Sequence, residues 1–119
     1  MNLQIKALRH PGDLKQERIV LKVLKDDDIG YYLLMDTTYT SDGNVSNLVR
    51  FPFWFPDKLI KKDDLVVLYT KKGQQSEKQN KNGTTSHFFY RGLDRTVWNE
   101  EGDCAVVFHV DNWVAKGVE

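Results

Sequence analysis

Residues 50–56 read Arg50-Phe51-Pro52-Phe53-Trp54-Phe55-Pro56, and this run decides the fold class of the chain. Three phenylalanines alternate with two prolines and a tryptophan, which is the period of two of a β-strand. Because proline has no N–H to donate to a sheet, we expect an edge strand or an extended segment laid across the core. The phenylalanines then occupy the core side, and Trp54 is expected to point outward.

The segments on both sides of this run have the same character. Short stretches rich in β-branched and aromatic residues alternate with turn signals, of which Asp42-Gly43 is the strongest. We expect strands over residues 3–7, 19–24, 31–39, 65–69, 87–90 and 104–110, besides 50–56. The sequence therefore predicts an all-β protein, an antiparallel β-sandwich of about seven to nine strands.

Two segments need separate interpretation. Residues 13–25 also fit a helix, with Asp13 as N-cap and Gln16 at the reciprocal capping position, but the β-branched residues at 19–23 favour a strand. The polar run at 71–83 predicts a long, mobile loop. Residues 98–103 predict a turn before the last strand.

Length and composition limit the possible classes. The chain has 119 residues, 40% of them hydrophobic and 29% charged, as expected for one globular domain over residues 1–119. The formal net charge is zero, which excludes adhesion to nucleic acid or membranes through global charge. The single cysteine, Cys104, stands in an apolar stretch and is expected to be structural. We find no signal peptide and no membrane span, so we expect a cytoplasmic location.

Five segments carry a resemblance to a known family. They are residues 17–21 (ERIVL), 32–36 (YLLMD), 50–53 (RFPF), 59–68 (LIKKDDLVVL) and 97–107 (VWNEEGDCAVV). In this order they resemble the lamin tail domain of bacterial proteins, an immunoglobulin-like β-sandwich. The resemblance implies an interaction module and transfers no functional residue. The chain departs from the family at Asp63-Asp64, where a glycine is usual, and in the long 71–83 segment.

The sequence offers no anchor for catalysis, so we expect no enzyme. Glycine-rich phosphate loops and a nucleophile elbow are absent from the sequence. The candidate metal ligands do not form pairs at short spacing; they are His10, His87, His109 and Cys104. The acidic run Asp26-Asp27-Asp28 lacks the ligand pattern of a calcium loop and is interpreted as a solvated turn. We therefore expect no metal and no cofactor.

Two kinds of binding site remain. Trp54 and Trp113 are candidates for exposed anchors of a protein partner, although core packing is the alternative for each. Residues 50–92 carry nine basic and four acidic side chains, which makes a basic surface over residues 58–91 possible. Its candidate nucleic-acid contacts are Lys71, Lys72, Lys78, Lys81 and Arg91, with a solubilising loop as the alternative. We expect a noncatalytic protein-binding module, with nonspecific nucleic-acid binding as the second hypothesis.

Overall fold

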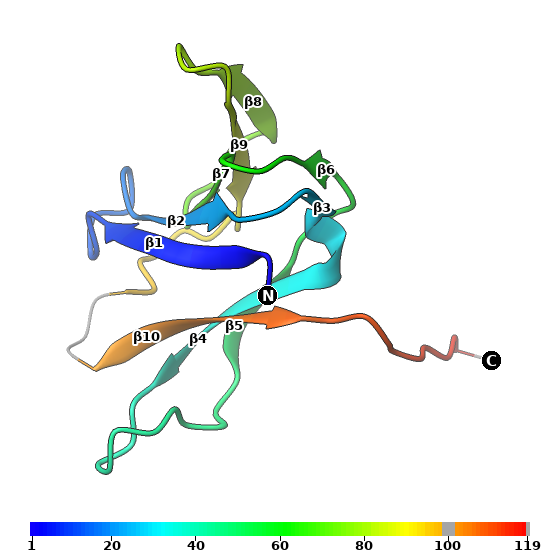
Figure 1. Ribbon diagram of the computed structural model, residues 1–119. Coiled ribbons are helices and arrows are strands. Elements are labelled where there is room, and N and C mark those ends of the chain that lie inside the picture. The colour runs from blue at the N-terminus through cyan, green and yellow to red at the C-terminus, as the bar shows by residue number, and fades with distance from the viewer. Residues whose placement is uncertain (99–101, 119) are drawn as a thin grey trace.

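The computed structural model describes residues 1–98 and 102–118 and is all-β (Figure 1), which confirms the predicted class. Within these residues, one 3-10 turn, η1 (Ile29–Tyr31), accompanies the strands. The strands are β1 (Leu3–Arg9), β2 (Arg18–Val23), β3 (Asp27–Asp28), β4 (Tyr32–Thr38), β5 (Arg50–Trp54), β6 (Leu59–Ile60), β7 (Leu65–Tyr69), β8 (Ser76–Gln79), β9 (Thr85–Tyr90) and β10 (Asp103–His109).

Two main sheets form the molecule. One has five strands in the order β1-β2-β7-β9-β8, the other has three in the order β10-β4-β5, and β3 and β6 form a small ribbon beside them. All pairs are antiparallel except β7 and β9, which run parallel, so the expectation of a purely antiparallel sandwich was wrong for this pair. The two sheets lie one above the other in Figure 1.

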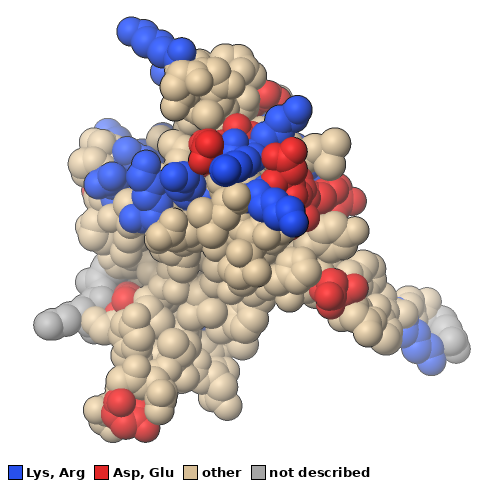
Figure 2. All heavy atoms as spheres, viewed as in Figure 1, with Lys and Arg blue, Asp and Glu red and all other residues tan. Residues whose placement is uncertain are grey.

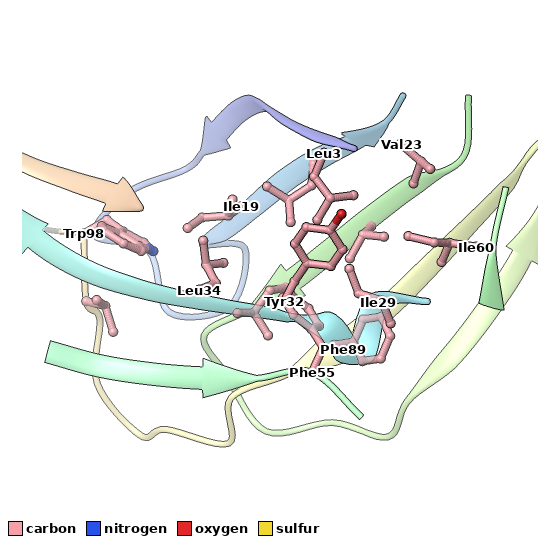
Figure 3. Close-up of a cluster of buried hydrophobic side chains, with 14 residues drawn as sticks. Leu3, Ile19, Val23, Ile29, Tyr32, Leu34, Phe55, Ile60, Phe89 and Trp98 are labelled. Atoms are coloured by element: carbon pink, nitrogen blue, oxygen red, sulfur yellow. The ribbon is translucent and has the colours of Figure 1, made fainter. Parts of the chain in front are cut away.

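The core fills the space between the sheets (Figure 3). Alternate residues of β2 point inward, so Ile19, Leu21 and Val23 are almost fully buried while their neighbours are not. The three-stranded sheet contributes Tyr32 and Leu34 of β4 from the opposite side. Each such side chain stabilises the fold by about 1.5–3 kcal/mol relative to an exposed one. The core therefore depends on the alternation that the sequence displays.

Residues 50–56 lie at a sheet edge, as the two prolines led us to expect. β5 is an edge strand of the three-stranded sheet, and Phe55 is buried just beyond its end. Phe55 makes edge-to-face contacts with Phe53 and Phe89, with ring centroids 5.0 Å and 5.1 Å away. Trp54 points outward and is 47% exposed, as predicted. The pairing with β4 is irregular near Phe51, whose φ of 48° lies in the left-handed region.

Residues 13–25 contain the strand β2 rather than a helix. A tight turn over residues 10–17 precedes β2, in which the amide of Glu17 donates to the carbonyl of Asp13. The preference for a strand at 19–23 is thereby confirmed. The predicted turn at 98–103 includes residues 99–101, which lie outside the described residues; Gly102, beyond them, has a φ of 93° that favours glycine.

The prediction of one long loop at 71–83 was wrong. Residues Ser76–Gln79 form the strand β8, which pairs with β9 and is joined to it by a turn at 80–84. All four residues of β8 are exposed and none is apolar, so no hydrophobic alternation marks the strand. Its sequence signal is Asn82-Gly83, where Gly83 has a φ of 85°.

Candidate functional site

The two candidate anchor tryptophans lie together. Their ring centroids are 5.1 Å apart in an edge-to-face arrangement, although Trp54 belongs to β5 and Trp113 to the segment after β10. Trp54 Nε1 donates to the carbonyl of Gly30 at 2.8 Å, which fixes its indole. Trp113 remains 59% exposed. The pair is a partly exposed aromatic corner held by a hydrogen bond at its base.

This corner continues into the outer side of the three-stranded sheet. The register places Phe108 of β10 beside Leu33 of β4, and Leu33 beside Trp54 of β5, so the three side chains form one row across the sheet. Phe108 is 41% exposed. Val106 and Met35 form the adjoining pair. We call the partly exposed set the apolar face; it consists of Leu33, Trp54, Val106, Phe108 and Trp113, whereas Met35 is only 4% exposed and is left out.

β10 forms one edge of the same sheet. Val110 donates to the carbonyl of Tyr31, and Tyr39 donates to the carbonyl of Gly102, which fixes the alternation of the ladder. The even-numbered residues of β10 therefore bond to β4, and the N–H and C=O groups of Ala105, Val107 and His109 point to the other side. Within the described residues no strand pairs with that side. Unlike β5, β10 contains no proline.

The candidate nucleic-acid contacts do not form one cluster. Lys71 lies over the ring of Tyr69 at 5.0 Å from its centroid, at the end of β7. Lys78 and Lys81 are exposed on β8 and the turn after it, and Lys72 is exposed in the preceding segment. In the view of Figure 2, basic side chains gather over β1 and β2, with mixed charges near β3 and β6.

Arg91 is not part of an exposed basic surface. Its guanidinium donates to the carbonyl of Phe51 and lies 5.9 Å from the ring centroid of Trp98, and its Nη2 atom is buried. Burial lowers the pKa of Arg91 to about 10. The side chain is better explained by its bond to the irregular backbone of β5, so its assignment to the nucleic-acid surface does not hold.

Sequence reasoning missed three buried polar centres. The carboxylate of Glu17 joins the turn before β2 to residues 70, 97 and 98. Asp36 lies 3.1 Å from Arg50 and is 1% exposed, so burial raises its pKa to about 6. Asp64 and His87 share a buried contact of 2.9 Å. Each partner lies far along the chain, so spacing alone could not have identified these centres.

Apart from the contact between His87 and Asp64, the histidines and carboxylates of the described residues do not gather into a metal-binding cluster. In the described part of the chain, no group of three or more His, Cys, Asp or Glu side chains could hold a metal ion. His87 faces Asp64 in the interior, whereas the ring of His109 lies beside Tyr32 with centroids 5.1 Å apart. Cys104 is buried, and desolvation raises the pKa of its thiol, which disfavours the reactive thiolate.

Residues 1–98 and 102–118 form no helix with the length and apolar character that a membrane crossing requires. Comparison with protein-family models yields no match, and neither do searches of curated proteins and of solved structures. The function of the chain is therefore inferred from the geometry of its sheet faces and edges.

Proposed function

We propose that this chain is a noncatalytic module that binds an extended segment of a partner protein as an added strand on β10. The observation that carries the proposal is the unpaired, proline-free edge of β10 beside the apolar face. An exposed edge offers a row of backbone donors and acceptors to another extended chain. The resemblance to the lamin tail domain, an immunoglobulin-like interaction module, agrees with this function.

The apolar face supplies what backbone hydrogen bonds alone do not, namely selectivity. In strand addition the main chain gives affinity, and contacts with alternate side chains give specificity. A strand paired with β10 places every second side chain beside Val106 and Phe108, on the outer side of the sheet. We therefore propose a partner segment with apolar residues at alternate positions. Trp54 and Trp113 lie at the opposite edge of this face, on the side of β5, and provide an aromatic anchor for a flanking segment of the partner that crosses the face.

The test starts from random linear peptides displayed on phage and selected against the full chain. Enriched peptides are synthesised with a fluorophore, and their affinities are measured by fluorescence polarisation. We expect alternating apolar residues in the enriched sequences. Ala105→Pro should lower the affinity at least tenfold, because it removes an outward N–H while leaving the bonds between β10 and β4 intact. Ala105→Ser keeps that N–H and is the matched control.

A second variant separates binding from folding. Trp113 belongs to a segment outside the strands, so Trp113→Ala leaves both sheets intact. Loss of an anchoring tryptophan typically costs at least about 2 kcal/mol, which corresponds to a roughly thirtyfold weaker affinity. Peptides that bind both variants as tightly as the parent would refute strand addition on β10, and so would a selection that enriches no extended apolar pattern.

A further inference from the structure

The outer side of the five-stranded sheet concentrates positive charge. Strand register aligns Arg9, Arg18, Tyr69 and Tyr90 in one row across β1, β2, β7 and β9. A parallel row holds Gln4, Lys22, Leu65, Ser86 and Lys78, and the row between them holds Ala7, Val20, Val67, Phe88 and Ser76. None of these positions is acidic, although the whole chain has no net charge. We call this surface, with Lys6 and Lys71 beside it, the basic face.

Aromatic rings hold some of these cations in place. The rings of Tyr69 and Tyr90 stack at 5.3 Å with an interplanar angle of 11°. Arg18 lies 5.6 Å and Lys71 5.0 Å from the centroid of Tyr69. Arg18 also donates to the carbonyl of Gln16 at 2.8 Å. The two positive charges are therefore positioned before any ligand arrives, which lowers the entropy cost of binding.

An open groove of about 490 Å³ lies at the Lys22 end of the basic face. Lys6 and Lys22 form one wall, and the turn between β8 and β9 forms the other. The projecting hairpin of β8 and β9 is visible in Figure 1. Among the described residues that line the groove, Asp63 is the one carboxylate, and it lies 3.9 Å from Lys22. The other lining residues are Leu65, Asn80, Asn82 and Thr84.

From these observations we infer that the basic face binds single-stranded nucleic acid. Its phosphates lie along the cations of β1 and β2, and its bases pack against the aromatic surface around Phe88. Phosphate contacts require positive charge without sequence readout, and only unpaired bases can stack on aromatic rings. This combination favours a single strand over a duplex. The basic face is the outer side of the sheet opposite β10, so the inference is independent of the proposed function.

The probes are fluorescein-labelled dT12, a mixed-sequence 12-mer and the matching 12-base-pair duplex. Anisotropy is followed while the full chain is added, at low and at near-physiological salt. The test variant combines Arg18→Ser with Lys22→Ser. Its control combines Lys61→Ser with Lys62→Ser, two exposed lysines near β6, and so loses the same charge elsewhere. Phe88→Leu tests stacking while keeping an apolar side chain.

We expect both single strands to bind more tightly than the duplex, with an affinity that falls as salt rises. The test variant should bind at least tenfold more weakly at low salt. The slope of log affinity against log salt should shrink by about 1.4, which is the value for two lost contacts to a single strand. Phe88→Leu should weaken binding without changing that slope. Circular dichroism checks that each variant is folded.

Three outcomes overturn the inference: absence of binding at low salt, a control pair that weakens binding as much as the test pair, and tighter binding of the duplex. Trp113→Ala should leave nucleic-acid binding unchanged. The peptide and nucleic-acid tests therefore fail separately, because they probe opposite sheets.

Discussion

Replacing Glu17 by Gln should destabilise the fold more than any exposed substitution. The side chain is fully buried, and its two oxygens accept four hydrogen bonds. Oε1 accepts from the amides of Gly12 at 2.9 Å and Trp98 at 3.1 Å. Oε2 accepts from the hydroxyl of Thr70 and from the amide of Val97 at 2.9 Å. Glutamine keeps one acceptor oxygen and turns the other into a donor.

The amide of Trp98 or that of Val97 then loses its acceptor in the interior and faces the new NH2 group of the glutamine. A buried donor without a partner costs about 1–3 kcal/mol, so the free energy of unfolding should fall by about 3 kcal/mol. Urea unfolding followed by tryptophan fluorescence measures this, because Trp98 is buried beside Glu17. With a typical slope of about 1–3 kcal/mol per molar urea, the midpoint should fall by at least about 1 M.

Glu77→Gln is the matched control. Glu77 lies on β8 with a half-exposed side chain, 3.3 Å from Lys58. An exposed ion pair contributes about 0–1 kcal/mol, so this variant should unfold within that range of the parent. If Glu17→Gln also stayed within 1 kcal/mol of the parent, the four hydrogen bonds would not hold the turn to the sheet as we describe.

Two further predictions concern the polar interior and the basic face. The pKa of Asp36 is raised from 3.8 to about 6, so the folded state binds this proton more tightly than the unfolded state, and stability from this group falls as pH rises between those values. Between pH 4 and pH 7, the free energy of unfolding of Asp36→Asn, measured with urea, should therefore rise by about 2 kcal/mol relative to that of the parent. If the difference between the two free energies did not change with pH, the raised pKa of Asp36 would be contradicted. In Gly73→Ala, the new Cβ would lie 2.4 Å from the ring of Tyr90, so we expect a loss of about 1–3 kcal/mol in the free energy of unfolding. Gly117→Ala, which meets no neighbouring atom, should leave it unchanged, and equal effects of the two changes would refute the packing argument.

Alternation made most of the strands predictable because burial on one face leaves a period of two in the sequence. It gave the outward direction of Trp54, whereas β2 was favoured over the helical alternative by its β-branched residues. Where burial does not select the residues, as in β8, the same reasoning failed. It also failed for the parallel pairing of β7 with β9, since pairing direction depends on how the intervening chain crosses between strands.

Asp63 and Asp64 form the turn before β7 without a glycine. Asp63 has a φ of 73°, a conformation that favours glycine and that aspartate adopts more readily than most residues. Asp64 accepts bonds from the amides of Lys61 and Thr85 and contacts His87. The carboxylate of Asp64 therefore anchors this turn to the neighbouring strand β9.

The candidate site was harder to predict than the fold because charge was counted along the chain and not across the sheet. Residues 1–49 contain six basic and seven acidic side chains and gave no sign of a basic surface. Yet Arg9, Arg18 and Lys22 come from that segment, and strand register places all three on one outer face. The count over residues 50–92 instead drew attention to Arg91, whose guanidinium points inward. For a sheet protein, a charge pattern becomes informative only after each strand has been assigned its inward and outward residues, because neighbours in sequence lie on opposite faces.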